Sequence, residues 1–174
     1  MEMIRLEENG LMTNDLVFAK VRPNAIIPTK ENENAGYDIY ANFDDDCLCI
    51  PAHSTKLIPT GIASAMTDKY YLNVAERGST GSIGMKYSAG IIDSSYRGEI
   101  FIAICNVNNI PIFISKTVDK VEEYDSAIYY PYKKAIAQLI VHEVPKMNVK
   151  EVTYDELLKI PSKRGAGALG SSGK

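Results

Sequence analysis

The apolar residues of the chain are grouped in short runs that are rich in Val, Ile and Tyr. These runs have the length of β-strands and are too short for ordinary helices. They span residues 16–21, 56–58, 70–75, 100–107, 110–114 and 136–141. Most of the eight prolines lie between the runs, as expected for many short strands joined by turns. The pattern predicts an all-β fold, either a barrel or a jelly roll.

One helical signal occurs late in the chain. Thr153 and Glu156 have the Thr-x-x-Glu spacing of a capping box, and Leu157 and Leu158 follow before Pro161. This spacing predicts a single short helix near residues 153–159.

Length, charge and cysteine content restrict the class of protein. A chain of 174 residues with 45% apolar positions is sufficient for one domain with a real core. A net charge of −3 gives no general positive field, so neither a nucleic acid nor an anionic membrane is expected as a partner. Three cysteines with no paired CxxC motifs predict neither a disulfide scaffold nor a zinc site. They favour a reducing, cytoplasmic location.

The apolar runs also argue against secretion and membrane insertion. No run approaches the roughly 18 apolar residues that a membrane span requires. Residues 1–8 are acidic and contain no apolar signal-peptide segment. We therefore expect no membrane association.

Glycine is concentrated in two parts of the chain. Five of the twelve glycines lie between Gly78 and Gly98, and four lie between Gly165 and Gly173. Glycine permits positive φ angles and close approach of backbone N–H groups to a ligand. Hairpin turns and a flexible tail would explain the same clusters, so the neighbouring residues must decide between these interpretations.

The first candidate site segment is residues 35–41. Alternation along a strand puts Tyr37 and Ile39 on one face and Asp38 on the other. A carboxylate in this position can hold a hydrated Mg²⁺ through water. The alternative interpretation is the solvated side of an edge strand.

The second segment, residues 76–82, follows a predicted strand. It contains Arg77, three hydroxyl residues and two glycines. Such a turn can direct several N–H and O–H donors at a phosphate, and the guanidinium adds a planar charge. A polar β-turn has the same composition, and the segment lacks the Gly-Lys-Ser/Thr of a Walker loop.

The third segment, residues 90–100, has the pattern of a hairpin with a polar turn. Asp93 lies at the end of the first strand, where a carboxylate can act as general base for a water molecule. Tyr96 offers a flat face for a sugar or a base. An ordinary hairpin with a surface aspartate is the alternative.

Taken together and in order, these segments resemble the five motifs of the homotrimeric dUTPases, which hydrolyse dUTP to dUMP and pyrophosphate. The resemblance spans nearly the whole chain and is carried most specifically by the hairpin. The five matching segments are residues 35–38, 77–81, 90–98, 136–139 and 164–173. The family resemblance implies a dUTPase-like jelly roll or β-barrel, with residues 1–163 as one domain and residues 164–174 as a mobile arm that closes over the site.

The resemblance also implies a role for each matching residue. Asp38 binds Mg²⁺ through water, Asp93 orients and activates the water that attacks the α-phosphorus, and Tyr96 packs under the deoxyribose and excludes a 2′-hydroxyl. The backbone of Ala89, Gly90 and Ile91 reads the uracil edge. The turn of Arg77, Gly78, Ser79, Thr80 and Gly81 and the side chain of Gln138 are expected to contact the phosphates or the waters around them. Arg164 and the tail residues Gly165, Gly167, Leu169, Gly170 and Ser171 are expected to bind substrate by closing over the γ-phosphate, with Leu169 at the position of a residue that stacks on uracil. The site is expected to combine residues of three protomers.

The chain departs from the family pattern at several positions. Gly78 occupies the usual serine position, Lys133 and Lys134 precede the fourth motif in place of the usual lead-in, and Leu169 replaces an aromatic residue. Residues 108–133 form a longer connection than usual, within which we expect residues 121–125 to lie on a surface excursion. The three cysteines are expected to be small core residues.

Two other functions fit the same pattern less well. A dCTP deaminase shares the fold and requires a glutamate base after the hairpin, for which Glu99 is available. A nucleotide-responsive protein that engages a protein regulator is a further alternative, because residues 108–133 have no assigned role.

Overall fold

The computed structural model describes residue 10 and residues 14–167, which fold mainly into β-strands. The strands in chain order are β1 (Leu16–Lys20), β2 (Gly36–Ile39), β3 (Cys47–Ile50), β4 (Thr55–Pro59), β5 (Ile62–Met66), β6 (Tyr70–Ala75), β7 (Met85–Ser88), β8 (Ile91–Ile92), β9 (Phe101–Asn106), β10 (Ile112–Ser115), β11 (Glu122–Tyr124), β12 (Ala127–Pro131) and β13 (Ala137–Glu143). The helices are α1 (Gly78–Gly81) and α2 (Tyr154–Leu158). The all-β prediction is confirmed.

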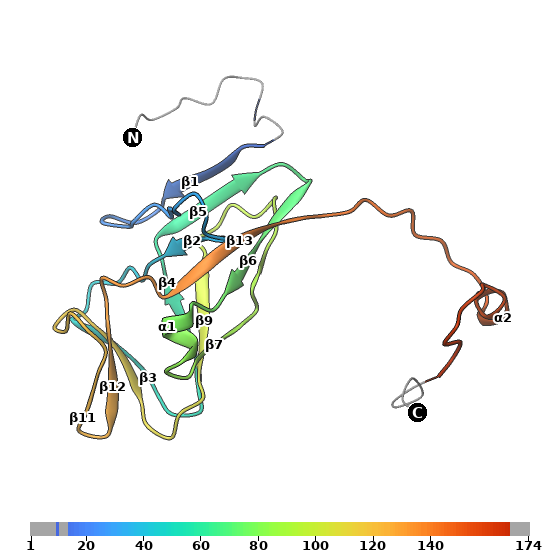
Figure 1. The fold of residues 1–174 in the computed structure, drawn as a ribbon. Helices are drawn as coiled ribbons and strands as arrows, with labels where there is room; N and C mark the ends of the chain where they lie inside the picture. The colour runs from blue at the N-terminus through green and yellow to red at the C-terminus, as the bar shows by residue number, and fades with distance from the viewer. Residues whose placement is uncertain (1–9, 11–13, 168–174) are drawn as a thin grey trace. The chain divides into compact units, whose positions relative to one another are not determined.

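The strands are arranged in four sheets (Figure 1). Their orders are β2-β13-β6-β8, β4-β9-β7, β11-β12-β10-β3 and β1-β5. All strand pairs among the described residues are antiparallel except β10 with β12. The sheets do not close into a barrel, so the barrel form of the predicted all-β architecture is not observed.

A single core, rich in isoleucine, joins these sheets. Alternation puts Ile102 and Ile104 of β9 in the core with no exposed surface, and puts Phe101 on the opposite face. Leu72 of β6 and Leu139 of β13 are equally buried in the neighbouring sheet. Because these side chains belong to one cluster, the strands that carry the candidate site are fixed relative to one another.

The long connection formed by residues 108–133 is built into the fold, and residues 121–125, the expected surface excursion, lie at its edge and are half-buried to exposed. The connection supplies β10, β11 and β12, which form a sheet with β3. Ile112, Ile114 and Tyr130 of this segment have no exposed surface. Alternating apolar residues make this connection part of the core, and β11 alone lies at the sheet edge with Tyr124 exposed.

The three cysteines also differ from the expectation of core residues. Cys47 is exposed, and Cys49 and Cys105 are half-buried. Cys105 lies in an apolar run, but it occupies the outer face of β9, whereas Ile102 and Ile104 occupy the inner face. The alternation of side chains along the strand therefore determines which face Cys105 occupies, even though its neighbours in the run are apolar.

The predicted capping box forms at α2. The Thr153 hydroxyl accepts a hydrogen bond from the Glu156 amide at 3.3 Å, and the Thr153 amide donates to the Glu156 carboxylate at 2.9 Å. The Thr153 amide and hydroxyl both donate to the Glu156 carboxylate, and these two bonds lower the pKa of Glu156. The short helix predicted near residues 153–159 is confirmed.

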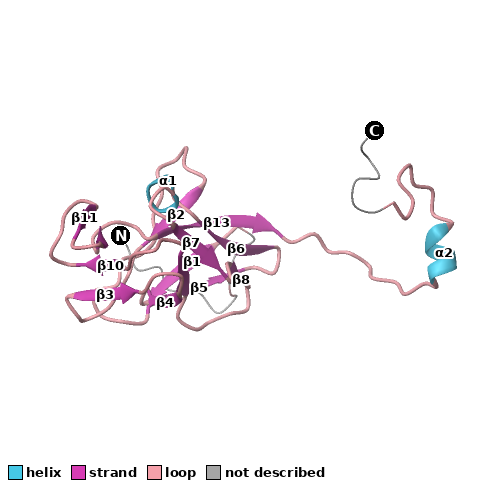
Figure 2. Cartoon of the chain, turned by 90° about the horizontal axis from the view of Figure 1, so that it is seen from below, coloured by secondary structure: helices cyan, strands magenta, loops and turns pink. Residues whose placement is uncertain are grey.

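The chain divides into two compact units after Val144. The first contains all thirteen strands, and the described part of the second consists of an extended stretch followed by α2 (Figure 2). Within the described residues, no helix has the length and apolar character needed to cross a membrane.

Candidate active site in two halves

The first half of the site lies where β2, β13 and β6 are side by side (Figure 1). Asp38 on β2 is the register partner of Gln138 on β13, and Gln138 is the partner of Ala75 at the end of β6. Arg77 follows two residues later. Three predicted site residues from distant parts of the sequence are thus brought to one edge of the sheet.

Asp38 and Arg77 form a bidentate ion pair. Arg77 Nε lies 2.9 Å from Asp38 Oδ1, and the Arg77 Nη2 donates to Asp38 Oδ2 at 3.0 Å. Both side chains are 31% exposed. A parallel pair of charge-assisted bonds fixes the guanidinium plane, and Nη1 also donates to the Ala135 carbonyl at 3.5 Å. One N–H group on each Nη atom then remains available to an anion.

The turn after Arg77 is a single turn of helix, α1, which the sequence did not predict. The buried Thr80 hydroxyl accepts a bond from the Arg77 amide at 3.1 Å and lies 2.9 Å from the Tyr87 hydroxyl. Ser79, by contrast, is exposed. Thr80 therefore holds the turn from inside, whereas Ser79 lies on the exposed side of the turn and borders the cavity described below.

Two tyrosines brace this turn, the buried Tyr130 and the half-buried Tyr87, and the sequence analysis missed both. Tyr87 donates to the Ile136 carbonyl, and Tyr130 donates to the Ala135 carbonyl at 2.7 Å. Burial raises the pKa of both phenols, so both remain neutral donors. Their positions in ordinary strand patterns gave no signal of this function.

Gly36 is required where β2 approaches β13. A Cβ atom at this position would lie 2.7 Å from Gln138 Oε1 and 2.9 Å from its Cβ. Gln138 in turn donates from Nε2 to the Glu76 carbonyl at 2.7 Å. Gly36, Asp38, Arg77, Ser79 and Gln138 border a cavity of about 290 Å³.

The second half of the site is the hairpin that follows β8. Asp93 is exposed at the strand end, and its carbonyl accepts from the Tyr96 amide at 3.1 Å to close the turn. A Cβ at Gly98 would lie 2.4 Å from the Tyr96 hydroxyl oxygen, so glycine is required where the ring lies against the backbone. Asp93, Tyr96 and Phe101 border a separate cavity of about 240 Å³.

The backbone before the hairpin has an unusual conformation at one residue. Ala89 has a φ of 53°, in the left-handed region that is uncommon for residues other than glycine. The carbonyl of Gly90 accepts from the Val74 amide at 2.7 Å, which fixes the strand entry. Ile91 is 58% exposed at the cavity that contains Asp93. Such a constrained, accessible backbone suits recognition by main-chain groups.

Glu99 anchors the hairpin to the core sheets. Its carboxylate accepts from the Gly61 amide at 2.9 Å and from Arg22 Nε at 2.8 Å, and its side chain is 13% exposed. A carboxylate held by two donors on its own chain is in a structural position. This arrangement gives no support to Glu99 as the base of a deaminase.

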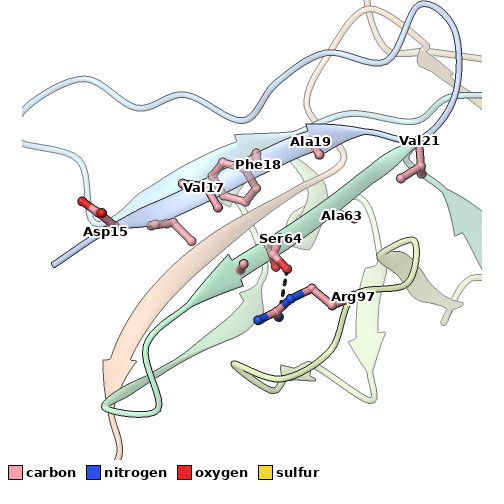
Figure 3. Close-up of a pocket in the computed structure, with 10 residues that line it drawn as sticks. Asp15, Val17, Phe18, Ala19, Val21, Ala63, Ser64 and Arg97 are labelled. Atoms are coloured by element: carbon pink, nitrogen blue, oxygen red, sulfur yellow. Dashed lines mark hydrogen bonds between the residues drawn. The ribbon is translucent and has the colours of Figure 1, made fainter. Parts of the chain in front are cut away.

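Arg97 fastens the other side of the hairpin. Its guanidinium donates to the carbonyls of Ser94 and Tyr96 and to the carbonyl of Ser64 on β5 (Figure 3). The same figure shows a groove along β1 and β5, with a volume of about 500 Å³, bordered by apolar residues such as Val17 and Ala63. This groove contains none of the predicted site residues, and Arg97 links it to the hairpin.

The two halves lie far apart within one protomer. Asp38 and Asp93 are separated by three strand spacings across the sheet β2-β13-β6-β8. Their positions are also offset by four residues along β6. The register row that contains Asp38 crosses β6 at Ala75, whereas Asp93 lies one residue beyond Ile92, which is paired with Leu72. Together these offsets amount to about 20 Å. One α-phosphate cannot contact both halves across that distance.

The residues at Asp38 fit a magnesium ion held through water. Among the described residues, no group of three His, Cys, Asp or Glu side chains could form a cage around a metal. Asp38 remains partly exposed, and a carboxylate that accepts two bonds retains further lone pairs. Mg²⁺ keeps several waters and commonly uses one or two carboxylates together with substrate phosphates.

The predicted residues of the C-terminal segment fall into two groups. Arg164, Gly165 and Gly167 are described in the second unit, where Arg164 Nε donates to the Gly167 carbonyl at 2.9 Å. Gly165 has a φ of 55°. Leu169, Gly170 and Ser171 lie outside the described residues. The role of this segment therefore stays a prediction.

Comparison with known proteins now assigns the family. A dUTPase family model matches residues 22–121. The deoxyuridine 5′-triphosphate nucleotidohydrolase of Candida glabrata is 34% identical over 166 residues, covering 94% of this chain and all of its own. The chain belongs to the dUTPase family. It is a dUTP diphosphatase, and the activity that this membership carries is hydrolysis of dUTP.

Solved structures show the same fold. The Staphylococcus bacteriophage 80alpha dUTPase with dUPNHPP aligns with a TM-score of 0.72 at 23% identity and covers 93% of this chain and 100% of its own. A mutant dUTPase from phage phi11 of S. aureus, described for its coordination of a structural Mg(II) ion, aligns with a TM-score of 0.63 at 20% identity. It covers 80% of this chain and 97% of its own.

Proposed function

We propose that the chain hydrolyses dUTP to dUMP and pyrophosphate in a homotrimer whose sites are each assembled from different protomers. The observation that carries this proposal is the separation of about 20 Å between the Asp38 and Asp93 halves within one chain. A cyclic trimer brings the hairpin of one protomer to the Arg77 edge of the next. Each complete site then has a nucleoside side and a phosphate side.

On the nucleoside side, Asp93 orients the attacking water and accepts its proton. The carboxylate is exposed at the rim of the cavity that also contains Tyr96, so it can reach a water next to the α-phosphorus. In-line attack on a phosphoryl group requires positioning and charge neutralisation more than covalent chemistry. An aspartate with this role needs no histidine partner.

On the phosphate side, Arg77 is already oriented by Asp38 and meets the phosphate oxygens with its free N–H groups. Ser79 and Gln138, together with Gly78, Thr80 and Gly81 of the same turn, complete this surface. Asp38 would hold Mg²⁺ through water, and the ion when bound supplies positive charge against the triphosphate. A preorganised guanidinium needs no reorganisation during the reaction.

The C-terminal segment completes the proposal. Residues 164–174 act as an arm whose Arg164 and backbone N–H groups, including those of Gly165 and Gly167, close over the terminal phosphate. Leu169 provides apolar area without an aromatic face, so closure depends more on phosphate charge than it does with a stacking ring. The arm adds charge and excludes water from the site.

Tyr96 should determine the choice between deoxyribose and ribose. Its ring lies against Gly98, and its hydroxyl donates to the Glu99 carbonyl at 3.0 Å, so the ring is fixed and cannot move aside for a 2′-hydroxyl. We expect Tyr96→Ala to reduce the ratio of kcat/KM for dUTP over UTP by about 10–200-fold. Steady-state kinetics with both nucleotides measure this ratio. Tyr96→Phe, which keeps the ring, is the control and should retain discrimination; an unchanged ratio in the alanine variant would contradict the role.

The shared site can be tested by mixing two inactive variants. Asp93→Asn and Arg77→Ala protomers are co-expressed with different affinity tags, and trimers that carry both tags are purified. In a cyclic trimer each mixed assembly contains one site with an intact Asp93 and an intact Arg77 from neighbouring chains. Activity should therefore recover to about one third of the wild-type value.

The outcome separates a shared site from a site within one chain. If both residues came from the same protomer, every chain in the mixture would lack one of them and the mixed trimer would stay inactive. Homotrimers of each variant, purified in the same way, are the matched controls. Release of pyrophosphate from dUTP is the measurement.

A further inference from the structure

The connection formed by residues 108–133 has no role in the site proposed above, yet one of its side chains reaches that site. Tyr130 of β12 has no exposed surface, and its ring belongs to the core cluster together with Ile114, its register partner on β10. The Tyr130 hydroxyl leaves this sheet and donates to the Ala135 carbonyl at 2.7 Å. The sheet β11-β12-β10-β3 therefore contributes a buried polar group next to the phosphate half.

The Ala135 carbonyl is also the atom that Arg77 reaches. Arg77 Nη1 lies 3.5 Å from it, at the limit of a hydrogen bond, whereas the Tyr130 bond has an ideal length. Ala135 is buried, so its carbonyl takes its partners from the protein. The phenol therefore makes the strong bond to this oxygen, and the guanidinium makes only a weak one.

The Arg77 guanidinium thus lies between two acceptors. Asp38 binds it at 2.9 and 3.0 Å, and the Ala135 carbonyl lies on the other side of the choice at 3.5 Å. Without the Tyr130 hydroxyl, Arg77 would be the remaining donor to this carbonyl in the part of the chain that the structure describes. Because a buried acceptor without a good partner costs free energy, Arg77 should move toward it, to about 2.9 Å. That movement turns the guanidinium away from Asp38.

The surroundings of the Tyr130 hydroxyl agree with a position in the phosphate half. Burial raises the pKa of Tyr130, whereas the Ser79 hydroxyl and the Arg77 guanidinium lie close enough to lower it. Ser79 and Arg77 both border the cavity that contains Asp38 and Gln138. The phenol is therefore adjacent to two of the side chains that face the phosphates in the proposed site.

We propose that Tyr130 is a positioning residue for dUTP hydrolysis: its hydroxyl occupies the Ala135 carbonyl, so that the Arg77 guanidinium stays paired with Asp38 and directed at the phosphates. The inference rests on the proposed phosphate contact of Arg77. It gives the connection of residues 108–133 a part in the reaction, through a residue that acts on Arg77 and not on the substrate itself.

Tyr130→Phe tests the proposal, because it removes the hydroxyl and keeps the ring that packs in the core. We expect kcat/KM for dUTP to fall by about tenfold or more, since a small displacement of a positioning group is costly. Steady-state kinetics measure this loss. Tyr129→Phe is the matched control: Tyr129 lies on the same strand with its ring stacked on Phe113 at 5.3 Å, on the opposite face, and this variant should keep the wild-type kcat/KM.

A double variant distinguishes positioning of Arg77 from a general effect on the fold. If Tyr130 acts through Arg77, the double variant Arg77→Ala, Tyr130→Phe should have the kcat/KM of Arg77→Ala within about twofold. A merely structural role would lower kcat/KM by the same factor with or without Arg77. Thermal unfolding of all four proteins reports the change in stability separately from the kinetics.

Each outcome has a distinct meaning. Wild-type kcat/KM in Tyr130→Phe, or an equal loss in the Arg77→Ala background, overturns the inference and leaves the role of Arg77 intact. Wild-type kcat/KM in Arg77→Ala contradicts the proposed phosphate contact, and the inference with it. If Tyr130→Phe fails to fold, 4-fluorophenylalanine at position 130 fills the space of the hydroxyl without donating a bond, and the same comparison then decides.

Discussion

Replacing Asp93 by Asn should lower kcat for dUTP by about 10²–10⁴-fold while the nucleotide still binds. Asparagine keeps the shape of the side chain but removes the carboxylate that accepts the proton of the attacking water. Because Asp93 is exposed and forms the turn through its backbone carbonyl, the substitution should leave the hairpin and the stability of the fold unchanged. Single-turnover hydrolysis together with dUMP binding by calorimetry separates chemistry from affinity.

The neighbouring hairpin residue Ser94 offers a matched control. Its side chain is half-buried and has no proposed role in the reaction, so Ser94→Ala should keep kcat close to the wild-type value. Near-normal turnover by Asp93→Asn would exclude the carboxylate as the base. A loss of dUMP binding that parallels the loss of turnover would instead indicate that Asp93 acts by holding the nucleotide.

Replacing Arg77 by Ala should lower kcat/KM by about 10²–10³-fold, because it removes a preorganised donor to the phosphates. The change also removes the guanidinium that pairs with both carboxylate oxygens of Asp38, so the negative charge of Asp38 faces the triphosphate uncompensated. The variant should therefore lose more affinity for dUTP than for dUMP, because the added repulsion acts on the β- and γ-phosphates. Binding of both nucleotides and steady-state kinetics measure these effects.

Arg77→Lys separates charge from geometry. Lysine keeps the positive charge but cannot make the parallel pair of bonds to Asp38, so it should recover only part of the lost activity. Full recovery would show that charge alone is required at this position. An alanine variant with wild-type kcat/KM would remove Arg77 from the site.

Local sequence pattern was sufficient for much of the fold. β6 occupies residues 70–75 as predicted, and α2 begins after the Thr153 cap. Both depend on interactions between residues close in the chain: alternation for the strand and a reciprocal capping bond for the helix. The short strands β5, β7 and β12 were not predicted, because small or mixed residues such as Ala63 and Ser88 give little periodicity and only tertiary pairing makes them strands.

The individual residues of the site could be predicted from the sequence, but their positions relative to one another in space could not. The segments around Asp38, Arg77 and Gln138 indicated phosphate chemistry, and the register of β2, β13 and β6 then brings these residues together. Nothing in the linear pattern indicated that Asp93 would lie about 20 Å away on the same sheet. Strand order is a long-range property, and a period of two in the sequence carries no information about which strands become neighbours.

The carbonyl of Ala135 limits how the connection before the fourth motif can change during evolution. This oxygen accepts from the buried Tyr130 at the end of β12 and lies 3.5 Å from Arg77 Nη1. Residues can be inserted between β9 and β12 only if the chain returns to the same atom. Deleting the sheet β11-β12-β10-β3 would remove the side chain that holds this atom in place. A change in this connection therefore reaches the phosphate half of the site and requires compensating substitutions there.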